Sequence, residues 1–358
     1  MVEVNIKRDI YKSLKIVAPG TPLREGLESI VNAKTGALIV IGDGEEVLKI
    51  VDGGFNINCD FTPSHLYELA KMDGAIILSN DSKKILYANT QLVPNQTISS
   101  DETGIRHRTA ERVAKQTNNL VIAISQRRNI ITLYKGNIKY VLKDSNEILN
   151  KANQAIQTLE KYKNVLNQAM NNLTALEFED LVTVYDVVKV IQRIEMVIMI
   201  SDEIERYMIE LGNEGRLISM QQDEIMSGVL DDGLNIIRDY LNRDDKSYIE
   251  IRDEIRTLFQ EGLLDLYTIA NIMGYDSGVA TLDSNIYPKG YRILNKIPRI
   301  PSNVLENIIN TFDNFQKILR ASTQELDLVE GIGEVRARTI KEGLRRFQEQ
   351  LFLERHII

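Results

Sequence analysis

Three side chains that are or can become cationic stand together where a helix is predicted to begin. The stretch DETGIRHRTAERVAKQ, residues 101–116, places Arg106, His107 and Arg108 side by side in a chain that has only three histidines. Neighbouring cations repel one another unless an anion lies among them. Guanidinium groups bind phosphate oxygens through paired hydrogen bonds, and the N-terminal end of a helix attracts the same ligand. The stretch therefore predicts a site for a phosphate group.

The local pattern leaves a second interpretation open. Thr109 can either cap the helix or donate a hydrogen bond to the same anion. Under the alternative, the arginines belong to a solvated basic face and pair with Glu102 or Glu111, which carry the opposite charge. The choice depends on what else the fold brings to the start of the helix.

A carboxylate lies directly before the N-terminal end of a predicted buried strand. In KMDGAIILS, Asp73, Gly74 and Ala75 lead into the apolar run. Carboxylate oxygens are good ligands for Mg²⁺ or Mn²⁺, and a Gly-Ala pair lets a flat base or a phosphate approach the backbone. The alternative is a turn aspartate that caps its own backbone. Asp73 is thus a candidate metal ligand.

A glycine-containing turn near the C-terminus is a second candidate for phosphate binding. In VEGIGEVRARTI, Gly331, Ile332 and Gly333 resemble the hairpin of the helix-hairpin-helix family. Two glycines around an apolar anchor allow close backbone approach and leave the N–H groups of the next helix free for a phosphate oxygen. The alternative is a turn in a protein–protein module. Basic residues in the first turns of the next helix favour DNA as the partner: Arg336, Arg338 and Lys341.

The same region contains an internal repeat with a short period. The units LNKIPRIPSNVLENIINTF and LDLVEGIGEVRARTIKEGLRRF each predict a helix, a tight hairpin and a second helix. The first unit has PRIP, residues 298–301, in place of the glycines, and is predicted to support the other unit. The apolar positions matched between the units are Ile297, Ile300, Val304 and Ile308 against Val329, Ile332, Val335 and Ile340.

Composition and charge are typical of a globular protein, and we expect it to be cytoplasmic. The sequence has 43% hydrophobic and 26% charged residues. No apolar run is long enough to span a bilayer, and no apolar segment follows a basic start. The single cysteine, Cys59, excludes an internal disulfide and is expected to be half-buried. The net charge of −8 is unevenly spread: residues 286–358 carry 12 Lys/Arg against 9 Asp/Glu, which favours a polyanion partner at the C-terminus.

The elements that must position these residues fall into three predicted domains. Residues 1–140 mix short Ile-, Leu- and Val-rich strands with amphipathic helices, which predicts an α/β domain with a mixed sheet flanked by helices. Residues 141–285 contain long amphipathic helices without proline and predict an all-α helical spine. Residues 286–358 predict an all-α helix-hairpin-helix DNA-binding domain. The predicted strands are GALIVIG, GAIILSN, KILYANT, NLVIAIS and NIITLYKG, with hairpin turns at NDSKK and QRRN, and the predicted helices of the first domain are PLREGLESIVNAK, PSHLYELAKM and RTAERVAKQT.

Together, D-G-A and, further along the chain, T-G-x-R-H-R-T-A-E-R resemble the diadenylate cyclase domain. With the helical spine and the helix-hairpin-helix tail, the resemblance extends over the whole chain to the DNA-integrity scanning diadenylate cyclases. One departure is Ile105, where many cyclase domains have threonine. The resemblance implies that two ATP molecules are condensed into cyclic di-AMP, with release of two pyrophosphates, by two domains that face each other.

The resemblance also implies roles for single residues and for partners. Asp73 is the metal ligand for Mg²⁺ or Mn²⁺ and helps to deprotonate the 3′-hydroxyl. The family forms octamers, acts in the response to DNA damage and DNA repair, and is expected to be inhibited by branched DNA bound at the C-terminal domain. The alternative is a non-catalytic DNA-binding scaffold that senses ATP or a cyclic dinucleotide. The residues carried over for ATP are Gly74, Ala75, Leu92, Thr109, Ser125 and Arg128, with Arg106, His107 and Arg108 on the phosphates.

Overall fold

The computed structural model describes residues 12–262, 265–276 and 278–355. Contacts between residues divide the chain into two compact units. The first unit contains residues 1–154 and 205–219, and the second contains residues 155–204 and 220–358. The three-domain division stays a prediction, and the outermost residues of its first and last domains, 1–11 and 356–358, lie outside the described residues.

In the described part of the first unit, eight strands form one mixed sheet. Its order is β2-β5-β4-β1-β6-β7-β8, and β3 pairs with β5 as well. β1 and β4 are parallel, whereas the other pairings are antiparallel. The mixed sheet predicted from the sequence is therefore confirmed. The strands are β1 (Ala37–Ile41), β2 (Val51–Asp52), β3 (Phe55–Asp60), β4 (Ala75–Leu78), β5 (Lys84–Leu92), β6 (Leu120–Ser125), β7 (Ile130–Lys135) and β8 (Ile138–Val141).

Both predicted hairpin turns are present in this sheet. NDSKK connects β4 with β5, and QRRN connects β6 with β7. The sequence analysis does not predict β2, β3 or β8. β3 has the sequence FNINCD, in which three apolar and three polar side chains alternate, so it lacks the continuous apolar run of the central strands. Cys59 lies on this strand and is half-buried, as expected.

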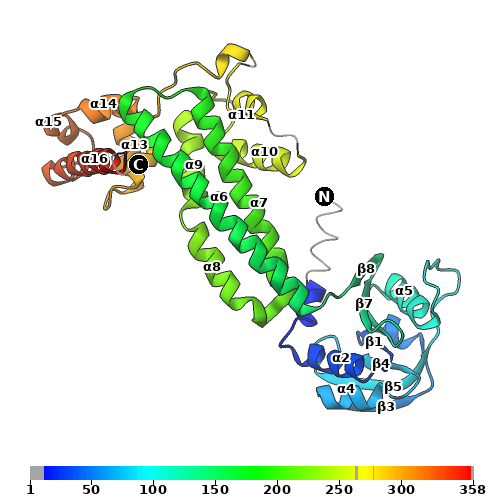
Figure 1. Cartoon of the computed structure of the whole chain (residues 1–358). Helices are drawn as coiled ribbons and strands as arrows, with labels where there is room; N and C mark the ends of the chain where they lie inside the picture. Colours follow the sequence, from blue (N-terminus) through cyan, green and yellow to red (C-terminus); the bar gives the residue numbers. More distant parts are fainter. Residues whose placement is uncertain (1–11, 263–264, 277, 356–358) are drawn as a thin grey trace. The chain divides into compact units, whose positions relative to one another are not determined.

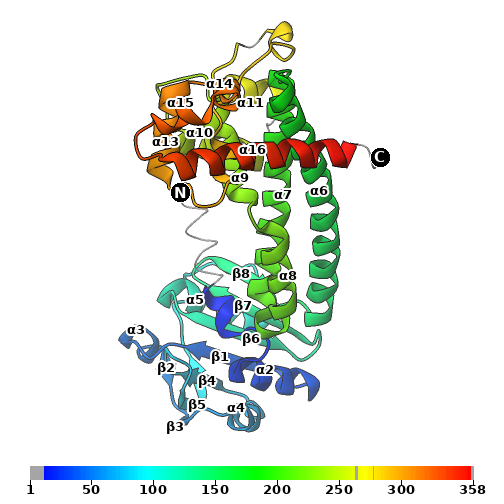
Figure 2. The same ribbon diagram turned by 90° about the vertical axis from the view of Figure 1, so that its left-hand side faces the viewer.

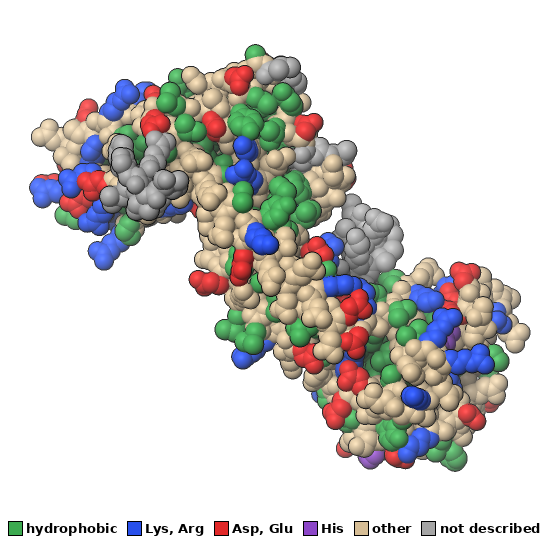
Figure 3. Space-filling view, viewed as in Figure 1, with side chains coloured by type: hydrophobic (Ala, Val, Ile, Leu, Met, Phe, Trp, Pro, Cys, Tyr) green, Lys and Arg blue, Asp and Glu red, His purple; other side chains and the backbone are tan. Residues whose placement is uncertain are grey.

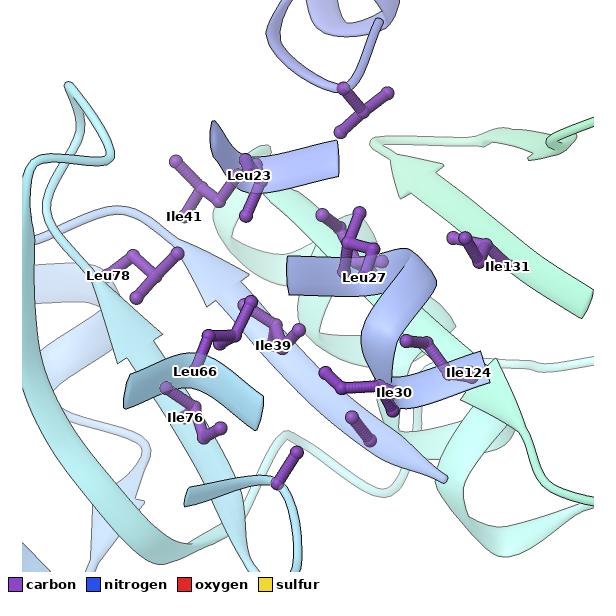
Figure 4. Packing of buried hydrophobic residues seen from close by; sticks show 14 of the residues in the cluster. Leu23, Leu27, Ile30, Ile39, Ile41, Leu66, Ile76, Leu78, Ile124 and Ile131 are labelled. Atoms are coloured by element: carbon purple, nitrogen blue, oxygen red, sulfur yellow. The ribbon is translucent and has the colours of Figure 1, made fainter. Parts of the chain in front are cut away.

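Helices cover both faces of the sheet, and the side chains of β1 alternate between them. Ile39 lies in one hydrophobic cluster with Leu27 of α2 and Leu66 of α4, as Figure 4 shows. Val40 belongs to the opposite cluster, which includes Val113 of α5. The predicted flanking helices are therefore confirmed. The confirmed helices are α2 (Pro22–Asn32), α4 (Pro63–Leu69) and α5 (Ile105–Thr117), and the sequence analysis does not predict α3 (Glu45–Leu48).

Two long helices, α6 and α7, confirm the predicted helical spine. They lie side by side in both Figure 1 and Figure 2, and the Arg193 guanidinium of α7 donates to the Val165 carbonyl of α6 at 3.3 Å. In the described residues, no helix combines the length and the apolar character needed to cross a membrane. The elements of this part are α6 (Ser145–Glu179), α7 (Val184–Leu211), η1 (Gly212–Gly215), α8 (Arg216–Met226), α9 (Val229–Tyr240), α10 (Tyr248–Gln260), α11 (Leu266–Ile272) and η2 (Val279–Thr281).

The C-terminal helices form two units of helix, turn and helix in the predicted places. Arg299 and Gly331 hold corresponding positions in the two turns, and both have positive φ angles, 69° and 84°. The predicted match of Val335 with Val304 is wrong, because Val335 is 79% exposed and the buried face of its helix passes through Ala337. The helices are α12 (Tyr291–Asn295), α13 (Ser302–Phe312), α14 (Phe315–Arg320), α15 (Thr323–Asp327) and α16 (Glu334–Arg355).

A buried ionic cluster attaches the C-terminal helices to the preceding helices of the second unit. The Arg292 guanidinium of α12 forms an ion pair with Glu177 of α6, and both side chains are at most 1% exposed. Asp239 of α9 accepts hydrogen bonds at 2.6 to 2.9 Å from the backbone N–H groups of Gly290, Tyr291 and Arg292. Buried charges require such partners. The cluster therefore fixes the start of α12 against α6 and α9.

Candidate functional site

A cavity of about 740 Å³ lies at one end of the central strands of the sheet in the first unit. β1 and β4 begin at this end and β5 and β6 finish there, because Ala37 pairs with Ile124 and Ala75 pairs with Thr90. The start of α5 contributes to the same cavity. The structure thus brings the Asp-Gly-Ala and Arg-His-Arg stretches together. The lining includes these predicted site residues: Asp73, Gly74, Ala75, Leu92, Arg106, His107, Thr109 and Ser125.

The backbone at Gly74 lies too close to β5 for any side chain to fit. A Cβ atom on Gly74 would overlap the backbone of Asn89. The Gly74 N–H donates to the Asn89 side-chain oxygen at 3.2 Å, and Asn89 itself has a positive φ of 53°. Asp73 is exposed at the cavity, directly before this close contact. The contact therefore fixes the position of the backbone that carries the Asp73 carboxylate.

The first turn of α5 has no side-chain cap. Gly104 is the N-cap residue and offers no side chain to the free N–H groups. The prediction that Thr109 could cap the helix is wrong, because the helix begins at Ile105 and Thr109 lies in its second turn. Thr109 lines the cavity instead. Uncapped backbone N–H groups at a helix start attract anions, which adds to the positive potential of this part of the cavity.

Arg106 extends from α5 to the beginning of β1. A Cβ atom on Gly36 would overlap the Arg106 guanidinium, so the missing side chain at that position makes room for it. Glu102 and Glu111 form ion pairs with lysines, at 2.5 and 2.8 Å. The arginine–glutamate pairs of the alternative interpretation are therefore not formed within the described part of the chain.

His107 is half-buried beside Tyr134. The two rings stand edge to face with their centroids 6.4 Å apart, and the Tyr134 hydroxyl donates to Glu102 at 2.7 Å. Burial lowers the pKa of His107, Glu102 opposes this shift, and the charge of Arg106 adds to it. The shift favours the neutral imidazole, in which one ring nitrogen is a donor and the other an acceptor.

Two predicted site residues lie outside the cavity lining. Arg108 is exposed, and its guanidinium donates to the carbonyls of Glu102 at 3.2 Å and Thr103 at 3.4 Å. Arg128 is exposed in the turn after β6, whereas its neighbour Arg127 belongs to the lining. The roles assigned to Arg108 and Arg128 stay predictions.

The lining also contains residues that the sequence analysis does not single out. Thr90 is buried in β5, and its hydroxyl donates to the Ala75 carbonyl at 3.2 Å. The residues from β1 and β5 reach the cavity only because of the strand register, which leaves no local pattern. The basic QRR turn is a signal that could have indicated Arg127. The residues missed are Leu38, Asn89, Thr90, Gln91, Gln126 and Arg127.

Asp73 is the only carboxylate in the lining among the described residues. Within that part of the chain there is no cluster of three or more His, Cys, Asp or Glu side chains able to hold a metal ion. Mg²⁺ often takes one or two protein carboxylates and completes its coordination with waters and substrate phosphates. The donor set therefore fits a divalent cation that binds together with a nucleotide, and does not fit a closed metal site.

The turn between α15 and α16 has the backbone form expected of a phosphate-binding turn. Gly331 has a positive φ of 84°, and a Cβ atom on it would lie 3.0 Å from a methyl group of Val304. Ile332 is buried in the C-terminal core. Around Gly333 there is open space. The turn therefore buries the Ile332 side chain in the core and leaves Gly333 accessible.

The three basic residues after this turn have different surroundings. The Arg336 guanidinium donates to the Gly331 carbonyl at 2.6 Å, and Arg338 pairs with Glu334 at 2.5 Å. The Lys341 ammonium donates to a carbonyl at the end of α14 at 2.9 Å. Figure 3 shows that lysine and arginine side chains gather on the surface of the C-terminal helices. Arg336 and Arg338 are exposed, whereas Lys341 is half-buried.

Comparisons with known proteins cover almost the whole chain. Residues 24–138 match the family model of the DisA bacterial checkpoint controller nucleotide-binding region, and residues 142–282 match that of the DisA bacterial checkpoint controller linker region. The chain is 60% identical over 349 residues to the DNA integrity scanning protein DisA of Clostridium perfringens, which covers 98% of each chain. It is 61% identical over 342 residues to that of Carboxydothermus hydrogenoformans, covering 95% of this chain and 97% of the relative.

Proposed function

Because the chain belongs to the DisA family and is a diadenylate cyclase, we propose that it condenses two ATP molecules into cyclic di-AMP with release of two pyrophosphates. The observation that carries the proposal is the meeting of Asp73 with Arg106 and His107 around one cavity. Phosphoryl-group chemistry depends mainly on positioning and on neutralising charge. A carboxylate for a metal and an arginine for the phosphates can supply both.

The cavity divides into parts suited to the two ends of ATP. Arg106 and the uncapped N–H groups of α5 bind the triphosphate oxygens, and Thr109 and Ser125 donate from their hydroxyls. Leu92 is buried and apolar, and packs on the adenine ring. His107 donates a ring N–H to a phosphate oxygen, which the imidazole can do whether it is neutral or protonated.

Asp73 would hold Mg²⁺ or Mn²⁺, which would neutralise phosphate charge. The chain contributes the carboxylate and the close Gly74–Asn89 contact that fixes the adjoining backbone. In each step, the 3′-oxygen of one ATP forms a bond to the α-phosphorus of the other. The bond from that phosphorus to pyrophosphate breaks, and the hydroxyl proton is released with the assistance of Asp73.

The symmetric product requires a second copy of the cavity. One cavity holds one ATP, and each 3′-hydroxyl must face the α-phosphorus of the other nucleotide. Ile105 lies in the lining at the start of α5 and is 84% exposed, so an apolar side chain is available at the face that would meet a second copy. The family resemblance supports a homo-octamer in the cytoplasm as the form that holds two faces together.

DNA is the proposed partner of the C-terminal helices. The accessible Gly333, the positive φ of Gly331 and the exposed Arg338 support contacts to the phosphate backbone, which read shape and not bases. We propose that branched DNA bound there lowers the cyclase rate. α6, α7 and α8 each contain residues of both compact units, so they are the elements that can carry such a coupling.

The first experiment compares Asp73→Asn with the unchanged chain. With ATP and Mg²⁺ or Mn²⁺, cyclic di-AMP and pyrophosphate are measured by chromatography and mass spectrometry, and ATP binding is measured separately by calorimetry. The variant should retain much of its ATP binding and lose turnover. Product formation at the normal rate would show that Asp73 is not the metal ligand, and intact ATP with the unchanged chain under both metals would favour the non-catalytic scaffold.

The second experiment tests the DNA proposal. Binding of a four-way junction and of a linear duplex of equal length is measured by fluorescence anisotropy at several salt concentrations, and the cyclase rate is measured with each DNA. Junction binding should weaken as the salt concentration rises, because the release of counterions from the DNA then contributes less. It should also weaken with Arg338→Met, because the substitution removes one phosphate contact. A rate that is the same with saturating junction and without DNA would refute the coupling.

A further inference from the structure

A second polar cavity, of about 260 Å³, lies within the second compact unit and takes no part in the proposed function. Its lining comes from α6, α7, α9 and the residue that follows α12. Two lysines from distant parts of the sequence, Lys163 and Lys296, both belong to it. The side chains of Asn167 and Asn171 follow Lys163 along α6 at intervals of one helical turn, so all three lie on one face of that helix.

The charges of this cavity do not balance. Lys296 lies 3.3 Å from one oxygen of Asp232 and 3.4 Å from the other. Asp232 is the only carboxylate in the lining among the described residues, so the second lysine, Lys163, gives the cavity an excess of positive charge. Burial lowers the pKa of Lys163, Asp232 opposes this shift, and the charge of Lys296 adds to it. The two ammonium groups therefore act on each other across the cavity, and an anion between them would relieve their repulsion.

We propose that this cavity binds a small phosphate-type anion that carries at least one proton on oxygen. The two lysines supply charge, and the carboxamide group of Asn167 supplies an N–H donor. Asp232 sets the remaining requirement. A carboxylate repels an anion that can only accept hydrogen bonds, but it accepts a hydrogen bond from a protonated phosphate oxygen or from a hydroxyl group. The lining therefore favours phosphate over sulfate, which has the same shape and no proton at neutral pH.

The test measures binding of inorganic phosphate and of sulfate to the full chain by isothermal titration calorimetry. Lys163→Met keeps most of the side-chain length and removes the charge, and Lys161→Met is the matched control on the exposed surface of α6. Lys163→Met should weaken phosphate binding about tenfold or more, since hydrogen bonds to charged groups are the stronger class. Lys161→Met should change it by less than about twofold. Asp232→Asn should remove the preference for phosphate over sulfate.

The cavity of the first unit that is proposed to hold ATP, called the nucleotide cavity below, also attracts phosphate. Each titration is therefore repeated in a chain with Arg106→Met. Phosphate binding that survives Arg106→Met and is lost with Lys163→Met belongs to the second cavity. Binding that is lost with Arg106→Met and kept with Lys163→Met belongs to the nucleotide cavity and overturns the inference. Equal effects of Lys163→Met and Lys161→Met would also overturn it, because they would show attraction to the general charge of α6. The thermal unfolding of each variant is recorded to show that it folds.

Discussion

Arginine side chains are held in opposite ways in the two compact units. In the second unit, Arg292 is enclosed and paired with Glu177. In the first unit, Arg106 is half-buried at a cavity, and no carboxylate among the described residues lies within ion-pair distance of it. A cation whose countercharge belongs to the chain stabilises the fold. A cation whose countercharge must come from outside is available to a ligand, so the partner of an arginine indicates its role better than its position in a motif.

The largest effect on stability is expected for Arg292→Met. The change leaves the Glu177 carboxylate buried without its countercharge, which should lower the free energy of unfolding by about 3–5 kcal/mol. Urea unfolding followed by circular dichroism measures this loss. Arg345→Met is the control, because Arg345 pairs with Glu349 on the exposed surface of α16 and should cost less than about 1 kcal/mol. Similar losses of unfolding free energy for both variants would show that the buried Arg292 contributes no more to stability than an arginine on the surface.

The same pair permits a sharper version of this experiment. In a chain that carries both Glu177→Met and Arg292→Met, the carboxylate that had lost its countercharge is also removed, so part of the lost stability should return. Asp239 stays buried and keeps its three backbone N–H donors, but it loses the nearby charge of Arg292. The Tyr240 hydroxyl, which donates to Glu177 at 2.7 Å, would then lose its acceptor and limit the recovery. If the loss in the double variant equals the sum of the losses in the two single variants, the ion pair does not account for the contribution of Arg292 to stability.

Arg106→Met should give the next largest effect, on activity and not on stability. Removing a charge that stabilises the transition state costs about 100- to 1,000-fold in rate, whereas a half-exposed side chain contributes less than about 1 kcal/mol to folding. Cyclic di-AMP production and urea unfolding are measured on the same preparations. Arg108→Met is the neighbouring control, and its loss of rate should be smaller because the Arg108 guanidinium contacts loop carbonyls. Equal losses would place both arginines on the phosphates.

Glu195 offers an intermediate case, a buried carboxyl group whose charge is only partly compensated. Burial raises the pKa of Glu195 to about 7, although Arg256 opposes the shift. The fold favours the uncharged form, so its contribution to stability is complete at low pH and is lost as the pH rises through about 7. Glu195→Gln cannot ionise and should be more stable than the unchanged chain by about 1–3 kcal/mol at pH 8, with no gain at about pH 4.5.

Thermal and urea unfolding at several pH values test this prediction. Glu205→Gln, on the exposed surface of the same helix, is the control and should show no such trend. A gain for Glu195→Gln that does not vary with pH would mean that the carboxyl group is not titrating in this range.

Gly36→Ala should give the smallest of the expected effects. The new methyl group would push the Arg106 guanidinium out of its position, so we expect the rate to fall about tenfold. Stability should change by less than about 1 kcal/mol, because the far end of a flexible side chain can move. Gly44→Ala is the control, since Gly44 has open space around it. A normal rate for Gly36→Ala would mean that the position of Arg106 does not depend on this contact.

Sequence reasoning succeeds here where the signal is local and periodic. Ala110, Val113, Ala114 and Thr117 of α5 recur at helical spacing, and all of them are buried. The turns that join β4 to β5 and β6 to β7 are also visible as short polar stretches between apolar runs. In these places one segment determines its own structure, so the sequence alone suffices.

Prediction fails where contacts join distant segments or where the predicted match along a helix is displaced by two residues. The ion pair between Glu177 and Arg292 joins helices far apart in the sequence, and nothing in either local pattern indicates it. Asn89 reaches the nucleotide cavity because of how β5 pairs with β4. Val335 shows the second problem, since residues close together along a helix lie on different faces. The buried residue is Ala337, so a match displaced by two positions exchanges buried for exposed.

The attachment of α12 has a mechanical consequence. Asp239 holds three successive N–H groups at the start of α12, and Arg292 in the same turn is tied to α6. The C-terminal helices therefore cannot pivot at this junction as a domain on a loose tether would. A force applied at the turn between α15 and α16 would therefore be transmitted to α6 and α9. The C-terminal helices and these two helices would move as one rigid part.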